Sequence, residues 1–262
     1  MNSDTAQQES QRVKMRVLPA VRPLDWLGRG AADLWRCPLP GLLHGLVVAG
    51  FGGLLLWAAH DRFWLLAGAF SGFLLMAPLV VTGLYAISRA LEQGQSPTLR
   101  TALAAWGPGH RRLVAFGLLL ALAGTGWVLT SAALITGFAP EPVRNPGDFV
   151  RVVLLGTDDW LFEAWMLLGG LMAAPVFASS VISIPLLLDR RIGVLAAVLT
   201  SWRVVAAHPV AMALWAACLI LLTLAGMLPL LLGMVVVAPL TAHASWHAYR
   251  DLVDASALPE RN

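Results

Sequence analysis

The sequence has few charged residues, almost no lysine and only two cysteines. Charged residues make up 13% of the 262 positions, about half the share in soluble domains, whereas hydrophobic residues make up 58%. Lysine occurs only as Lys14, so arginine carries nearly all the positive charge. Cys37 and Cys218 lie far apart and fit no metal-binding or disulfide spacing. This composition excludes a soluble domain and predicts an integral membrane protein.

The sequence also lacks the motifs of common enzyme classes. It contains no P-loop, no Gly-rich phosphate loop, no HExxH and no recognisable Ser/His/Asp set. The net charge of +3 lies between apolar runs rather than along one face, so it does not indicate a nucleic-acid partner. Residues 1–17 are polar and lack the apolar core of a cleavable signal peptide. We therefore expect no catalytic residue, no nucleic acid, and a disordered cytoplasmic tail over residues 1–20.

Six apolar runs are long enough to cross a bilayer, which needs about 20 residues per helix. Three shorter amphipathic stretches each end in or near a tryptophan, a pattern typical of helices that lie in the membrane plane. On the first of these, Asp25, Arg29 and Asp33 share the polar face. The expected spans cover residues 41–59, 63–90, 113–138, 160–188, 209–225 and 229–250, and the in-plane helices cover 24–35, 98–106 and 192–207.

These elements predict an all-α membrane protein built from three hairpin units, each an in-plane helix followed by two spans. The units cover about 21–90, 98–188 and 192–250, inside a single membrane domain over 21–254 that is followed by a C-terminal tail over 255–262. The second span of each unit contains an Ala-Pro pair, and proline kinks a helix because it removes a backbone donor. The predicted kinks are at Pro78, Pro175 and Pro239. Unrelated helices with a similar pattern remain the alternative to a repeat.

The distribution of Lys and Arg predicts the orientation. Of the 18 such residues, all but Arg62, Arg144 and Arg151 lie in the termini and in the loops on the same side as the termini. Because positive residues concentrate in the cytoplasm, both termini and all three in-plane helices are expected there, in a multi-pass protein of the bacterial inner membrane. Five or seven spans, the alternative, would place the C-terminal arginines outside.

Polar and aromatic side chains gather at the predicted cytoplasmic ends of the second, fourth and sixth spans. We expect them to form a polar cluster that binds lipid headgroups, a partner or an anion. The alternative is simple anchoring by an aromatic belt and positive charge. The candidate residues are Tyr85, Arg89, Glu92, Asp189, His243, Trp246, His247, Tyr249 and Arg250.

Two histidines in the last span are weak candidates for a metal site. His243 and His247 lie one helical turn apart on the same face, where two imidazoles can share a metal or a haem. Further ligands are required, and the nearest candidates are Glu92, Asp189 and, for haem, His44. The other interpretation is that both histidines bind carbonyls freed at the kink or reach the interface. We therefore expect no metal and no cofactor, with haem or metal as the alternative.

Three segments carry a family resemblance. Residues 83–97 (GLYAISRALEQGQSP), 183–190 (SIPLLLDR) and 243–253 (HASWHAYRDLV) resemble the DUF2189 family of predicted bacterial integral membrane proteins, and the resemblance covers about 20–254. Members often have Glu after the tyrosine of the first segment, where this chain has Ala86. The resemblance implies six spans in the bacterial inner membrane and no particular activity.

The sequence does not specify an activity, and three functions fit it. The first is a non-enzymatic scaffold or accessory subunit of a membrane complex, with a membrane-protein partner or as a homo-oligomer. The second is a small-solute or lipid transporter or channel, because many transporters are built from repeats. No ionisable residue lies deep in a span, the nearest being His44 and His243, which weighs against ion-coupled transport. The third is a haem- or metal-binding membrane protein.

Overall fold

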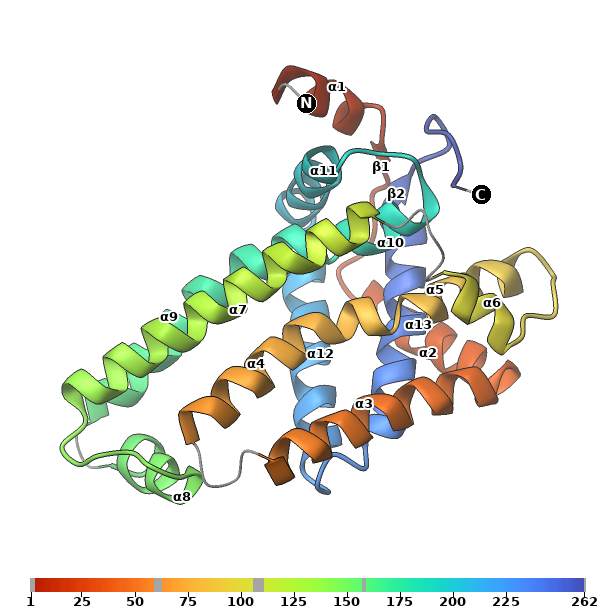
Figure 1. The fold of residues 1–262 in the computed structure, drawn as a ribbon. Coiled ribbons are helices and arrows are strands. Elements are labelled where there is room, and N and C mark those ends of the chain that lie inside the picture. Colours follow the sequence, from red (N-terminus) through yellow and green to blue (C-terminus); the bar gives the residue numbers. More distant parts are fainter. Residues whose placement is uncertain (1–2, 59–62, 106–110, 157–158, 262) are drawn as a thin grey trace. The chain divides into compact units, whose positions relative to one another are not determined.

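The computed structural model describes residues 3–58, 63–105, 111–156 and 159–261, and over these residues the protein is all-α (Figure 1). The only strands in this part of the chain are two pairs of residues. The elements are α1 Ser3–Gln11, β1 Lys14–Met15, α2 Arg22–Arg36, α3 Pro38–Ala58, α4 Phe63–Val80, α5 Thr82–Glu92, α6 Leu99–Ala104, α7 Arg111–Phe138, α8 Pro146–Phe149, the π-helix η1 Val150–Leu154, α9 Asp159–Ser180, α10 Ser183–Asp189, α11 Val194–Ala207, α12 Pro209–Met227, α13 Met234–Leu252 and β2 Val253–Asp254.

Four helices in the described ranges are long and apolar enough to cross a membrane. They are Pro38–Ala58, Arg112–Phe138, Trp160–Asp189 and Pro209–Met227, which correspond to the first, third, fourth and fifth expected spans. The second and sixth expected spans are not in this set, so the count of six is not confirmed. The apolar stretch at Phe63–Phe73 is shorter. Residues 228–233 form turns, so α13 begins only at Met234 and its second half is polar.

Helices α2, α6 and α11 lie at the three stretches that were expected to lie in the membrane plane, and each precedes a long apolar helix. In the first two cases, the helical segment after this long helix is divided in two. Helices α4 and α5 are separated at Val81, and helices α9 and α10 are separated at residues 181–182. In the third case α13 continues past its proline. A helix of 6 to 15 residues, a longer apolar helix and a further helical segment thus follow one another three times, and the three hairpin units remain a prediction. The three prolines are Pro78 in α4, whose side chain lies outside the described residues, Pro175 in α9 and Pro239 in α13.

The described residues divide into two compact units, and the single membrane domain over 21–254 remains a prediction. Unit 1 comprises Met1–Gly50, Ala77–Phe116 and Phe177–Asn262, and unit 2 comprises Phe51–Met76 and Gly117–Val176. In unit 2, η1 and the segment before α8 pack on α7 and α9 through a small apolar core. Its buried members are Ile135, Val143, Val152, Val153 and Leu161.

Unit 1 is built around α13, which packs against α2, α5, α10 and α12 (Figure 1). Helix α2 lies closest. A Cβ added at Gly30 would come within 2.7 Å of the Ala244 backbone nitrogen and 2.9 Å of the Leu240 oxygen, so only glycine allows this approach. The buried indoles of Trp26 and Trp215 meet edge to face at 5.6 Å and join α2 to α12. Apolar contact between these helices therefore fixes the position of the polar half of α13.

The predicted disordered tail differs from the structure, which has helix α1 at Ser3–Gln11 packed on α11. Ala6, Ser10 and Val13 are buried, at a helical spacing that puts small side chains on one face. The Thr200 hydroxyl donates to Ser10 Oγ at 3.0 Å, and Arg203 donates to the Ser10 carbonyl at 2.7 Å. A polar segment can thus form a helix when its few small residues pack against a neighbouring helix. The C-terminal segment is ordered as well, with Ala255 and Leu258 buried.

Candidate functional site

The polar half of α13 is buried inside unit 1. His243, Trp246 and Tyr249 are at most 1% exposed, and His247 is 6% exposed. The sequence predicted these residues at an interfacial helix tip. They are enclosed instead, because α2, α5 and α10 cover this half of the helix.

A chain of hydrogen bonds joins three helices through the two histidines. Ser88 of α5 donates to Asp33 Oδ2 of α2 at 2.7 Å and lies 2.7 Å from His243 Nδ1. His247 Nε2 lies 2.8 Å from the same Asp33 oxygen. Because the single Ser88 proton goes to the carboxylate, His243 must donate its Nδ1–H to Ser88. The histidines therefore bind side chains of other helices, rather than the kink carbonyls or the interface.

Asp33 differs most from its sequence prediction. It was expected on the polar face of an in-plane helix with Asp25 and Arg29, but it is 4% exposed. Burial raises the pKa of its carboxyl, and the hydrogen bonds from His247 and Ser88 outweigh that effect, so the pKa lies below its ordinary value. Asp33 is thus a carboxylate at neutral pH, held inside the protein by two donors.

A second group of contacts surrounds Asp189 at the end of α10. The Tyr249 hydroxyl donates to Asp189 Oδ2 at 2.7 Å. Arg190 Nε donates to the same oxygen at 3.0 Å, and Arg89 Nε lies 3.3 Å from Asp189 Oδ1. The ends of α5, α10 and α13, which are far apart in the sequence, therefore share one ionic centre.

The aromatic residues of the predicted cluster pack next to these charges. The rings of Tyr85 and Trp246 stack with centroids 6.5 Å apart, and Trp246 contacts Tyr249 at 5.4 Å. Arg250 Nε donates to Glu92 at 3.1 Å, and His247 Nδ1 lies 3.7 Å from Glu92. All nine candidate residues of the sequence thus lie in unit 1 and are linked by contacts through α13. Of the predicted kink residues, Pro239 is buried in unit 1 and Pro175 belongs to unit 2.

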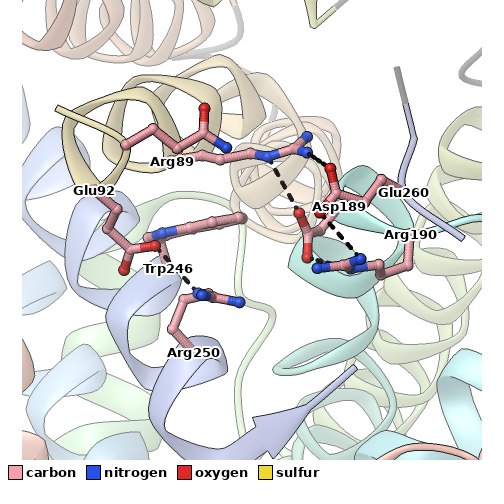
Figure 2. Close-up of a pocket in the computed structure, with 8 residues that line it drawn as sticks. Arg89, Glu92, Asp189, Arg190, Trp246, Arg250 and Glu260 are labelled. Carbon is pink, nitrogen blue, oxygen red and sulfur yellow. Dashed lines mark hydrogen bonds and ion pairs between the residues drawn. The ribbon is translucent and has the colours of Figure 1, made fainter. Parts of the chain in front are cut away.

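A small pocket opens among the ends of α5, α10 and α13, and we call it the charged pocket (Figure 2). Its cavity volume is about 130 Å³. Trp246 contributes an indole N–H that is buried and has no hydrogen-bond partner within the described part of the chain. The lining residues are Arg89, Glu92, Gln93, Asp189, Arg190, Trp246, Arg250 and Glu260.

Residues 65–189 match the DUF2189 family, which is described as "Predicted integral membrane protein (DUF2189)". The family resemblance of the sequence is confirmed over this stretch. It is narrower than the expected 20–254, so α13 and its histidines lie outside it. No curated protein and no solved structure matches the chain.

The DUF2189 match contributes part of both contact groups. Ser88, Arg89 and Asp189 lie inside it, whereas Asp33 and the α13 residues come from the flanking sequence. The site therefore joins the region of family similarity to helices on either side of it.

Sequence reasoning missed the burial of Asp33 and the participation of Arg190 and Glu260. A signal for Asp33 was present, because Trp26, Gly30 and Asp33 follow the i, i+4, i+7 spacing of one buried helix face. Glu260 had no such signal. It reaches Arg89 and Arg190, at 3.2 and 3.3 Å, only because the C-terminal segment folds back to pair with residue 190.

Helix α2 is fastened to the end of α13 by Asp251. This carboxylate accepts hydrogen bonds from Arg22 Nε at 2.7 Å, from Trp26 Nε1 at 3.0 Å and from the Arg29 guanidinium. Burial raises the pKa of Asp251, but the bonds from Arg29, Arg22 and Trp26 lower it more, so the pKa lies below its ordinary value. The clamp holds the first in-plane helix against the last helix of the chain.

A metal site needs several ligands that converge on one point. Within the ranges that the structure describes, no three His, Cys, Asp or Glu side chains are grouped in that way. The pair His243 and His247 is engaged by Ser88 and Asp33 instead.

Proposed function

We propose that this integral membrane protein is a non-enzymatic scaffold or accessory subunit of a membrane complex. The observation that carries the proposal is that its buried polar side chains are bonded to one another across helices. Asp33, Ser88 and His247 connect α2, α5 and α13, and Asp189 connects α10 to α5 and α13. Such networks stabilise one fixed arrangement of helices, which is what a platform for a partner requires.

The geometry of Ser88 supports a structural role over nucleophilic catalysis. A catalytic serine is open to substrate and gives its proton to an imidazole, which is oriented by a carboxylate. Ser88 is fully buried, and its hydroxyl lies 2.7 Å from the carboxylate of Asp33 itself. Serine, histidine and aspartate thus meet here, but the serine lies between the other two and connects their helices.

The proposal includes the topology expected from the sequence. Residues 63–90 and 229–250 would supply two further spans beside the four candidate helices, giving six in the bacterial inner membrane with both termini in the cytoplasm. The supports are the asymmetry of Lys and Arg and the recurrence of an in-plane helix before each pair of helices.

The experiment is purification of the tagged full-length chain from its native host in a mild detergent, followed by mass spectrometry of the proteins that accompany it. A partner membrane protein in fixed stoichiometry is the expected result. An unrelated inner-membrane protein with the same tag is the control. Recovery of the chain alone, or as a homo-oligomer with only lipid, would contradict the accessory-subunit role.

A small-solute or lipid transporter is the second candidate, favoured by the threefold recurrence of elements, since transporters are often built from repeats. Reconstitution into liposomes and a flux assay test it. Solute or lipid movement above that of empty liposomes would support transport, and equal movement would count against it.

A further inference from the structure

We propose that the charged pocket binds a zwitterionic group in which an ammonium and a phosphate lie side by side, as in the headgroup of phosphatidylethanolamine. The proposal goes beyond the scaffold role and does not depend on it. It rests on the charge balance of the pocket, on its unused hydrogen-bonding groups and on its place at the end of a candidate span.

The charges of the pocket alternate and cancel. Three guanidinium groups and three carboxylates line it, and each guanidinium contacts a carboxylate. A ligand of one sign would therefore meet as many like charges as unlike ones. A dipolar ligand can place each end against its opposite, which is the condition for a stable buried ion pair. The residues are Arg89, Arg190 and Arg250 with Glu92, Asp189 and Glu260.

The donors for a phosphate are present and incompletely used. Arg250 is bonded to Glu92 through Nε, and no partner among the described residues meets its Nη atoms. Arg190 contacts Asp189 through Nε, and Glu260 and the Leu258 carbonyl through Nη1, which leaves its Nη2 available to a ligand. The buried N–H of Trp246 also lacks a partner. This N–H is one of six buried side-chain nitrogens without a partner in the described residues, and among these only it belongs to a residue that lines the charged pocket, where a bound acceptor would satisfy it. Guanidinium and N–H groups are the usual partners of phosphate oxygens.

The acceptors for an ammonium lie on both sides of the same pocket. Figure 2 shows Glu92 and Glu260 at opposite ends, with Trp246 beside Glu92. The side chains of Glu92 and Glu260 are 31% and 57% exposed, so both can turn toward a ligand. An indole is also the best aromatic partner for a cation. Acceptors at the Glu92 end and donors beside them fit a ligand with two opposite charges.

The position of the pocket fits a lipid headgroup. Asp189 is the last residue of the candidate span Trp160–Asp189, so we expect the pocket at the level where this stretch leaves the bilayer and headgroups begin. A cavity of about 130 Å³ can hold a headgroup, while the acyl chains stay in the membrane. Free phosphoethanolamine has the same chemistry and is the alternative source.

The test measures lipid binding to the purified full-length chain in detergent by native mass spectrometry. We expect phosphatidylethanolamine to bind about tenfold more tightly than phosphatidylglycerol, which corresponds to about 1.4 kcal/mol. Arg250→Gln and Trp246→Phe should each remove most of this preference. Arg100→Gln, an exposed arginine outside the pocket, is the matched control and should leave it unchanged. If Arg250→Gln fails to fold, Trp246→Phe decides, because it keeps an aromatic ring at this buried position and removes the N–H together with part of the indole.

Competition identifies the source of the ligand. Displacement of the lipid by free phosphoethanolamine would support the site and show that it accepts the soluble compound, whereas no displacement would show that it needs the lipid. Phosphatidylglycerol or inorganic phosphate bound as tightly as phosphatidylethanolamine would overturn the proposal, because the site would then recognise an anion alone. Unchanged preference in both pocket variants would overturn it too. The presence or absence of a co-purifying protein partner affects none of these outcomes.

Discussion

Asp33 is the residue on which the internal network of unit 1 depends. It is a buried carboxylate that accepts from Ser88 and His247, and each of these side chains belongs to a different helix. Without that charge, two buried donors would lose their acceptor. Leaving buried polar groups unpaired costs more than an exposed interaction gains, so the effect of a substitution at this position should be large.

Asp33→Ala is expected to destabilise the protein by about 1–3 kcal/mol for each of the two buried donors, Ser88 and His247, that it leaves without an acceptor. Asp25→Ala is the matched control on the same helix, because Asp25 is half-exposed and its pairs with Arg22 and Arg29 are worth about 0.3–0.5 kcal/mol each. The measurement is thermal unfolding in detergent at pH 7. Equal melting temperatures for the two variants would show that the network contributes nothing.

Asp251 predicts a pH dependence. Its pKa in the folded protein lies below the ordinary value of 3.8, so it stabilises the fold above about pH 4, and the stabilisation is lost as the pH falls through the folded pKa. Asp251→Asn removes that contribution at every pH. The difference in melting temperature between wild type and variant should therefore be wide at pH 7 and should narrow as the pH falls below about 3.8 toward the lower folded pKa. A difference in melting temperature that does not change with pH would show that the charge of Asp251 does not stabilise the contact of α2 with α13.

These two acids show what the sequence could and could not reveal. The sequence indicated a polar cluster, because Arg89 and Arg250 lie in the last turns of two helices that occupy corresponding places in the expected units. It did not indicate the partners of the cluster. An aspartate between apolar residues fits an interfacial face as well as a buried one, and only the packing of α2 on α13 decides which face is enclosed.

At the scale of elements, close contact of α2 with α13 brings Asp33 to the histidines and Asp251 to the arginines. That contact requires a residue without a side chain at position 30. The order of the helices, and roughly where they begin, could be predicted from the apolar runs and the positions of the prolines. The interruptions at Val81 and at residues 181–182 were not predicted, although Pro78 and Pro185 lie within four residues of them, because proline can kink a membrane helix without ending it.

Gly30→Ala and Gly28→Ala form a matched pair on α2. Both changes raise helix propensity by about 1 kcal/mol. Gly28 has no atom within 4 Å of an added Cβ, so Gly28→Ala should be neutral or stabilising. Gly30→Ala should cost about 1–3 kcal/mol, because its Cβ would collide with the α13 backbone. Unfolding temperatures in detergent compare them, and a stabilised Gly30→Ala would mean that the helices are not in close contact.

At the scale of the whole molecule, pairing of the two ends of the chain constrains the topology. Strands β1 and β2 are antiparallel, with Lys14 opposite Asp254 and Met15 opposite Val253. Segments that are hydrogen-bonded to each other lie on the same side of a membrane, so the number of crossings between them is even. Four or six spans satisfy this condition, and the five- or seven-span alternatives do not. Composition alone left them open, because the ends meet only through tertiary contacts.

Cysteine labelling tests the orientation that the arginines predict. In a chain with Cys37 and Cys218 replaced by alanine, single cysteines are introduced at three exposed positions: Glu141→Cys, Gln95→Cys and Ala257→Cys. A maleimide that cannot cross the membrane should label only Glu141→Cys in intact cells, and all three after lysis, because the loop after α7 is expected outside and the other two positions inside. Gln95→Cys and Ala257→Cys should behave alike, since the ion pair of Arg89 with Glu260 holds the C-terminal segment beside the end of α5. Labelling of Ala257→Cys without Gln95→Cys in intact cells would require an odd number of spans between these two positions and would contradict the contact of Arg89 with Glu260.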